Sequence, residues 1–403
     1  DAVCSLGFFN NLKYDWVQAD HLKNAKLLNK RLPKYSPDQL IGLKSTKDKK
    51  INLAFLSSDI RLKHSVTYFL RTVLEDTNQD KFNIFLYLNN KNEDETTNEF
   101  KRYVYRTRNI INLSNIDAIN VIRKDEIDII IDLNGFSSNH RLALFKNRLA
   151  PIQISWCGYI NTIGLGEMDY LLADKNLIYQ EERSLYSEKI FYLPNIWNCH
   201  SGYDFERIKY EAPLISNKYI TFGSFNNYTK INDDVIKVWS LILKKVKNSK
   251  LILKTSIPTS KSIILEKFEK NGIIKSVKFL SYKKSFREHL NQYKNIDIAL
   301  DTFPWNGVTT SFESIWMGVP VLTMKGHNSN SRCGESINKN IGLNELIAEN
   351  NEDYINKAVL IANSQKKLQD IRNKIFENAL SSPLFDKKKF ANEFFNSLEK
   401  IYN

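Results

Sequence analysis

One stretch, residues 296–323, constrains the fold of this chain more than any other, because it reads as strand, loop, short helix and strand. It opens with the apolar run 296–300, which is typical of a strand buried in a parallel sheet. Pro304 and Gly307 then break the chain into a loop. A helix follows, which Gly318 ends after about two turns. The apolar residues beyond it predict a second buried strand.

The start of this short helix suits a phosphate group. A loop of small residues that leads into a helix points unpaired backbone N–H groups, and the positive end of the helix dipole, at one spot. Gly307 lets a ligand approach the backbone, and the hydroxyls of Thr309, Thr310 and Ser311 can donate to phosphate oxygens. Glu313, one turn into the helix, is expected to accept hydrogen bonds from ribose hydroxyls.

The same residues allow a second interpretation. Thr310 and Glu313 have the T-x-x-E spacing of a capping box, in which the two side chains satisfy each other's backbone N–H groups. A capping box would be purely structural, so both interpretations stay open at this point.

Alternating strand and helix patterns predict an α/β protein with two Rossmann-like parallel sheets. A chain of 403 residues exceeds one ordinary hydrophobic core, which also favours two domains. In the first half we expect strands at 51–56, 82–88 and 127–133, and helices at 66–74 and 115–124. In the second half we expect strands at 219–225, 251–254 and 277–282, and helices at 233–246 and 286–293.

The predicted domain organisation has three parts. Residues 1–48 form a short helical segment, interpreted as the end of an upstream repeat array, and a polar linker runs over 44–50. Residues 49–205 form the N-terminal Rossmann-like domain. Residues 206–403 form the C-terminal domain, with C-terminal helices.

The predicted ligand site lies where the strands end. In open parallel sheets ligands bind at the carboxyl ends of the strands, so the loops after Phe225, Tyr282 and Asp301 should converge at a cleft between the two domains. Lys230 lies at a strand-to-helix turn, where a cation can stabilise the charge of a departing diphosphate. An ordinary surface lysine is the alternative.

Two histidines are further candidates. His64 follows the first strand, in a loop expected to face the same cleft, and is the best-placed general acid or base of the first half. His289, on the short helix before residue 296, can donate to a phosphate oxygen. The alternatives are a solvent-exposed histidine for His64 and a structural histidine for His289.

Several classes of site are excluded by missing motifs. The chain has no D-x-D after an apolar strand, no G-x-x-x-x-G-K-[ST] loop and no G-x-G-x-x-G fingerprint. Its four cysteines form no C-x-x-C pair, which argues against zinc and fits a reducing cytoplasm. We therefore expect no metal and no cofactor.

Net charge and hydropathy limit the classes of binding partner that can be expected. The net charge of +13 would suit a nucleic acid, but the lysines are scattered among carboxylates, so a generally basic surface is favoured over nucleic-acid binding. No apolar run is long enough to span a bilayer, so no membrane partner is expected. The first residue is Asp, which leaves open what precedes it.

Motifs along nearly the whole chain resemble the catalytic region of glycosyltransferase family 41, the protein O-linked N-acetylglucosamine (O-GlcNAc) transferases and their bacterial relatives. The matching segments are Phe55-Leu-Ser-Ser-Asp59, Asp132-Leu-Asn-Gly135, Ala150-Pro-Ile-Gln-Ile-Ser-Trp-Cys-Gly-Tyr159, Met168-Asp-Tyr170, Tyr186-Ser-Glu-Lys189, Phe222-Gly-Ser-Phe-Asn-Asn227, Asp301-Thr-Phe-Pro-Trp-Asn-Gly307, Trp316-Met-Gly-Val-Pro320, Ser331-Arg332 and Ser381-Ser-Pro-Leu384. The resemblance implies a GT-B fold, a UDP-sugar held mainly by the second domain, and inverting, metal-independent transfer to a protein side chain.

The resemblance also implies a role for each candidate site residue. His64 would be the catalytic base, and Lys230 would contact the diphosphate together with the phosphate-binding Thr309 and Thr310. Gly307 and Val308 belong to the phosphate loop, where Val308 replaces a histidine of the animal enzymes, and Asn227 stands where those enzymes have a glutamine. His289 would contact the nucleotide, Ser285 lies where the uridine meets the backbone, and Glu313 replaces a ribose-binding aspartate.

The expected function is transfer of N-acetylglucosamine from UDP-GlcNAc to Ser or Thr of an acceptor protein or peptide. The nearest alternative is UDP-glucose-dependent transfer of glucose to Asn, and a UDP-sugar 2-epimerase is a more distant one. A non-catalytic interaction module and a weak nucleic-acid binder remain from other classes.

Overall fold

The computed structural model describes residues 2–13, 15–35, 49–255, 257–283 and 285–403. They fall into two compact units. The first runs to Ser201 and also includes Asp386–Asn403, and the second is Gly202–Phe385. Part of the predicted N-terminal segment and linker, residues 36–48, lies outside the described residues.

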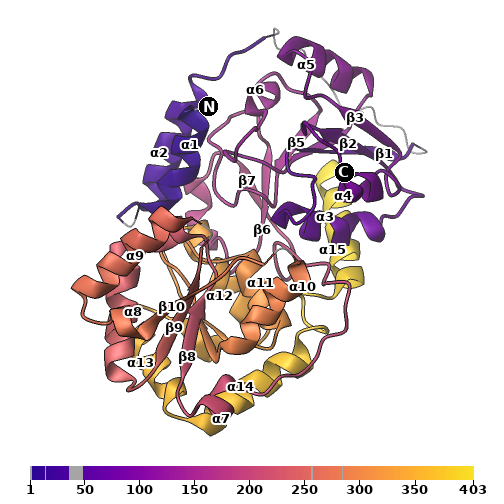
Figure 1. Cartoon of the computed structure of the whole chain (residues 1–403). Coiled ribbons are helices and arrows are strands. Elements are labelled where there is room, and N and C mark those ends of the chain that lie inside the picture. The colour runs from indigo at the N-terminus through magenta and orange to yellow at the C-terminus, as the bar shows by residue number, and fades with distance from the viewer. Residues whose placement is uncertain (1, 14, 36–48, 256, 284) are drawn as a thin grey trace. The chain divides into compact units, whose positions relative to one another are not determined.

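The first unit is built on a parallel sheet of seven strands (Figure 1), in the order β3-β2-β1-β4-β5-β6-β7. Every residue of the central strand β1 is buried, as expected for a parallel strand covered on both faces. Its Ala54 pairs with Phe85 on one side and Ile130 on the other. The strands are β1 (Ile51–Ser57), β2 (Phe82–Leu88), β3 (Arg106–Asn109), β4 (Ile129–Asp132), β5 (Ile152–Ser155), β6 (Tyr170–Ala173) and β7 (Lys189–Tyr192).

Helices cover this first sheet, and one of them comes from the far end of the sequence. The helices are α1 (Ala2–Phe9), α2 (Gln18–Asn29), α3 (Ser65–Glu75), α4 (Glu95–Phe100), α5 (Asn115–Lys124), α6 (Leu142–Phe145) and α15 (Lys387–Tyr402), with short 3-10 turns η1 (Asn10–Leu12) and η2 (Gln180–Leu185).

Helix α15, yellow in Figure 1, belongs to the first unit through its aromatic face. The Phe394 ring centroid lies 4.7 Å from that of Trp156 and 6.5 Å from that of Phe55. The predicted C-terminal domain, 206–403, includes this helix, whereas the contacts group it with the first unit. The structure differs because burying these rings against the first sheet removes a large apolar area from water.

The second unit holds a parallel sheet of six strands in the order β10-β9-β8-β11-β12-β13. Gly223 allows the close packing at its centre, because a Cβ there would lie 2.3 Å from the Ile296 side chain. The strands are β8 (Thr221–Ser224), β9 (Lys250–Lys254), β10 (Val277–Leu280), β11 (Ile298–Leu300), β12 (Val321–Met324) and β13 (Ile347–Ala348).

Eight helices of the described chain accompany this second sheet. They are α7 (Pro213–Asn217), α8 (Asp233–Lys245), α9 (Pro258–Lys270), α10 (Phe286–Asn291), α11 (Thr309–Trp316), α12 (Cys333–Asn340), α13 (Asn351–Ala362) and α14 (Gln365–Asn378). The 3-10 turns are η3 (Tyr228–Lys230), η4 (Ile274–Ser276), η5 (Gln292–Asn295), η6 (Ser329–Ser331) and η7 (Asn344–Leu346).

The predicted helices and strands are found close to their expected bounds, but the edge strands β3 and β13 and several helices, among them α9 and α12, were not predicted. Strand β3 was not predicted because it is polar and partly or fully exposed along its whole length, so it lacks the apolar run of a buried strand. Within the described part of the chain, no helix is long and apolar enough to cross a membrane.

Candidate functional site

Three segments that lie far apart in the sequence meet at the strand ends of the second unit. Asn226 follows β8, and its side-chain amide donates to Asp301 Oδ1 at 3.3 Å, directly after β11. Its Oδ1 accepts a hydrogen bond of 2.9 Å from the Thr310 hydroxyl in the first turn of α11. The loops after β8 and β11 therefore converge with the helix start, as the parallel topology predicts.

A buried carboxylate shapes the loop between β11 and α11. Asp301 is 1% exposed, and it accepts hydrogen bonds from the Gly307 backbone N–H at 2.7 Å and the Thr323 hydroxyl at 2.8 Å. Burial raises the pKa of this carboxyl to about 6, and the hydrogen bonds oppose the rise. Gly307 is needed because a Cβ there would lie 2.6 Å from Thr310 Oγ1 and 2.8 Å from Asn226 Oδ1.

Lys230 brings a cation to the same loop. It is the last residue of η3, and its Nζ donates to the carbonyl oxygen of Asn306 at 2.7 Å. The ammonium also lies 4.6 Å from the centroid of the Trp305 ring. Burial lowers the pKa of Lys230 to about 8, with the nearby Asp301 opposing the shift. The predicted diphosphate-binding lysine thus lies beside the predicted phosphate loop.

The start of α11 is not closed by its own side chains. Its N-cap is Val308, whose side chain cannot accept a hydrogen bond, and Thr309 is the first helical residue. The capping box offered as an alternative is wrong, because Thr310 donates to Asn226 while Glu313 accepts from the Tyr293 hydroxyl at 2.7 Å. This leaves the N-terminus of an eight-residue helix without a side-chain cap.

Glu313 and His289 face each other, as a joint nucleotide site would require. His289 Nε2 lies 3.1 Å from Glu313 Oε2, and its Nδ1 contacts the Nζ of Lys254, the last residue of β9. The Phe225 ring centroid lies 6.2 Å from that of the imidazole.

Asn227 and Ser285 are not part of this cluster. Asn227 is exposed and caps η3, with its Oδ1 accepting from the Thr229 N–H at 3.1 Å. Ser285 is exposed at the N-cap of α10 and makes no side-chain capping bond. The roles of both residues stay predictions.

Four residues that hold the site together were not predicted from the sequence: Asn226, Lys254, Tyr293 and Asp301 as a hydrogen-bond acceptor. Asn226 and Asp301 were quoted only as parts of motifs. Their position directly after buried strands was the signal that could have identified them, since strand ends carry ligand sites in parallel sheets.

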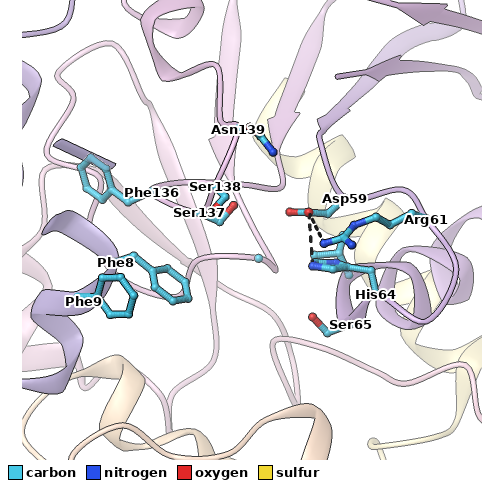
Figure 2. A pocket seen from close by; sticks show the side chains of 12 residues that line it. Phe8, Phe9, Asp59, Arg61, His64, Ser65, Phe136, Ser137, Ser138 and Asn139 are labelled. Atoms are coloured by element: carbon cyan, nitrogen blue, oxygen red, sulfur yellow. Dashed lines mark ion pairs between the residues drawn. The ribbon is translucent and has the colours of Figure 1, made fainter. Parts of the chain in front are cut away.

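In the first unit, His64 is the N-cap residue of α3 and lines a pocket of about 460 Å³. Figure 2 shows His64, Arg61 and Asp59 on one side of this pocket, with Phe8 and Phe9 on the other. His64 Nε2 lies 3.4 Å from Asp59 Oδ1. Its Nδ1 is buried and has no hydrogen-bond partner among the described residues. Burial lowers the pKa of His64, and Asp59 opposes this.

Asp59 is held in place by the motif Asp132-Leu-Asn-Gly135, which begins at the end of strand β4. The Asn134 side-chain amide donates to Asp59 Oδ2 and to Ser58 Oγ, both at 2.8 Å. The Asn134 backbone is fixed in turn by the buried Asp132, which accepts its N–H at 3.2 Å. The carboxylate beside His64 is therefore oriented by strands β1 and β4 together. Across the described ranges, no group of three or more His, Cys, Asp or Glu residues is arranged to hold a metal ion.

Comparisons with known proteins point to one family. Glycosyl transferase family 41 matches residues 21–203 and 205–394. A tomato (Solanum lycopersicum) protein named "Probable UDP-N-acetylglucosamine--peptide N-acetylglucosaminyltransferase SPINDLY" is 33% identical over 84% of this chain. The SPINDLY protein of Arabidopsis thaliana is 31% identical over 85% of the chain. The chain spans only 37% and 38% of the lengths of these two relatives.

Solved structures agree with the fold. A lysine-to-methionine mutant of the Thermobaculum terrenum O-GlcNAc transferase superposes with a TM-score of 0.93 at 26% identity, covering 100% of this chain and 77% of that one. HepE of Anabaena, solved with UDP and glucose, has a TM-score of 0.57 at 12% identity over 87% of this chain and 100% of its own, which speaks for the fold alone. These likenesses confirm the predicted α/β fold of the GT-B class, with two parallel sheets.

Proposed function

Because the chain belongs to glycosyltransferase family 41, we propose that it transfers N-acetylglucosamine from UDP-GlcNAc to Ser or Thr side chains of proteins, with inversion and without a metal. The observation that carries this proposal is the bond from the Lys230 ammonium to the Asn306 carbonyl, in the loop that leads into the uncapped start of α11.

The donor diphosphate is proposed to bind at this helix start. The backbone N–H groups and the helix dipole attract phosphate oxygens, and Lys230 can exchange its bond to the Asn306 carbonyl for one to the diphosphate. A fixed ammonium and fixed backbone donors supply the positive potential that many nucleotide-sugar enzymes take from a divalent ion. Glu313 is proposed to accept from the ribose hydroxyls.

In the proposed reaction the acceptor hydroxyl oxygen attacks the anomeric carbon of the sugar. The new carbon–oxygen bond forms as the bond from that carbon to the β-phosphate oxygen breaks, and its electron pair leaves with UDP. The hydroxyl proton goes to His64 or to a phosphate oxygen of the donor. Lys230 and the start of α11 stabilise the charge that develops on UDP.

Calorimetry in EDTA tests the donor site. We expect wild type to bind UDP and UDP-GlcNAc, and Lys230→Met to lose at least about tenfold in affinity, because one charge-assisted contact is removed. Lys261→Met is the matched control, since the Lys261 ammonium also lies over a ring, 5.5 Å from the Phe279 centroid, on an exposed side chain. Equal binding by all three proteins would contradict the proposed role of Lys230.

Transfer of labelled sugar to a peptide array then tests the reaction. We expect label from UDP-GlcNAc on Ser or Thr peptides. A preference for UDP-glucose with label on Asn would favour the alternative N-glucosyltransferase. Binding without any transfer would favour the interaction module.

A further inference from the structure

We propose that Lys254 is a positioning residue for the nucleotide donor, which fixes the proton of His289 so that Glu313 presents one free carboxylate oxygen to the ribose. This inference rests on the proposed function, because it assigns the nucleoside part of the same site. Lys254 was not among the residues predicted from the sequence.

The contact between Lys254 and His289 determines which ring nitrogen carries the proton. Lys254 Nζ contacts His289 Nδ1. A lysine ammonium only donates hydrogen bonds, so Nδ1 must accept, and the proton of the neutral imidazole lies on Nε2. The Nε2–H group then donates to Glu313 Oε2, which lies 3.1 Å away.

The carboxylate of Glu313 is satisfied on one side only. The Tyr293 hydroxyl donates to the same oxygen, Oε2, at 2.7 Å. Among the described residues, no hydrogen bond to Oε1 is found, although Glu313 is only 5% exposed. Oε1 is not among the buried side-chain atoms that lack a partner, so it remains open to solvent, and a hydroxyl of a bound ligand can donate to it.

The ammonium of Lys254 is held in place by two aromatic rings. Its Nζ lies 5.7 Å from the centroid of the Phe225 ring and 5.5 Å from that of Tyr282. The lysine is therefore fixed at the ring nitrogen of His289 that does not contact Glu313.

A simpler role for Lys254 would be to attract the diphosphate by its charge. The two roles differ in what they do to ribose recognition. If Lys254 acts by its charge, its loss weakens the binding of UDP and of an analogue without ribose hydroxyls equally. If Lys254 is a positioning residue, its loss weakens only the binding of the ligand that carries the hydroxyls.

The experiment compares binding of UDP and 2′,3′-dideoxy-UDP by calorimetry in wild type, Lys254→Met and the control Lys261→Met. We expect wild type and Lys261→Met to prefer UDP by about tenfold or more, since ribose hydroxyls bonded to a carboxylate are lost in the analogue. We expect Lys254→Met to bind both ligands within about twofold of each other. An unchanged preference in Lys254→Met would overturn the inference while leaving the proposed function intact. No UDP binding by wild type would overturn both.

A second measurement needs no ligand and does not depend on how well the variant folds. Nitrogen-15 NMR of the wild-type histidines reports which ring nitrogen carries the proton. We expect His289 to be protonated on Nε2 in the neutral form. A proton on Nδ1 would overturn the inference, because the Lys254 ammonium could not then donate to it.

Discussion

The Thr310 hydroxyl donates to Asn226 Oδ1 at 2.9 Å, although 84 positions separate the two residues in the sequence. The bond ties the first turn of α11 to the loop after β8, and Asn226 extends it to Asp301. A helix start whose spacing suggests self-capping is therefore anchored to another strand of the sheet, and its backbone donors remain without a side-chain cap.

We expect Gly307→Ala to weaken UDP binding by about tenfold or more, because the new methyl group must displace the Thr310 or Asn226 side chain from that bond. Calorimetry measures the change. Gly166→Ala is the matched control, since a Cβ there meets no atom within 4 Å. An affinity of Gly307→Ala equal to that of the control would mean that the Thr310–Asn226 bond is irrelevant to the donor.

The affinity for UDP should fall as the pH rises through about 8, where the pKa of Lys230 lies. The sign follows from the charged form: the ammonium that attracts the diphosphate predominates below this pKa and is lost above it. Above this pKa, the affinity for UDP should fall by about tenfold per pH unit. Calorimetry from pH 7 upwards measures it, and Lys230→Met should show a flat profile over the same range.

Asp301→Asn should destabilise the protein by about 2–4 kcal/mol, because an amide cannot replace a carboxylate that accepts from both Gly307 and Thr323. Denaturant unfolding measures the loss. Asp370→Asn, at an exposed position on α14, should stay within about 0.5 kcal/mol of wild type.

The penalty of Asp301→Asn should also depend on pH. Burial raises the pKa of Asp301 in the folded protein to about 6, above the ordinary value of 3.8 for an aspartate. The carboxyl therefore contributes most to stability at low pH, and this contribution is lost as the pH rises through about 6. The penalty should be larger at about pH 5 than at about pH 7, and the opposite order would contradict the pKa direction.

His64→Gln should slow sugar transfer by about 10²–10⁴-fold if His64 takes the acceptor proton. Its UDP affinity should stay within about twofold of wild type, because the proposed donor contacts belong to the second unit. Initial rates on an acceptor peptide, with the exposed His327→Gln as control, measure the effect. Near-normal transfer would assign the proton to the donor phosphate instead.

Much of the fold could be predicted from the sequence because buried parallel strands leave a strong local pattern. Strand β2 and helix α5 match their expected ranges, 82–88 and 115–124. Strand β3 left no such pattern, since its polar residues lie at the partly exposed edge of the sheet. Helix α15 was assigned to the second domain because its partners Phe55 and Trp156 lie more than 200 residues earlier.

The candidate site was predictable where motif and position coincide, and less so where contacts run between strands. Lys230, Thr310 and Glu313 could be found from a loop that feeds a helix. The link from Lys254 through His289 to Glu313 could not, because it joins β9, α10 and α11, and nothing local in any of the three encodes it. The motif match led to Asn227, while the structure places its neighbour Asn226 in contact with Asp301.

Because α15 packs on the first sheet, the two units differ in how the gene encodes them. The second unit is encoded by one uninterrupted stretch, whereas the first needs both ends of the chain. A stop codon after Phe385 would therefore spare every residue of the second unit. It would instead remove Phe394, which packs against the Trp156 ring, so a truncation that follows the second unit in sequence would destabilise the first unit.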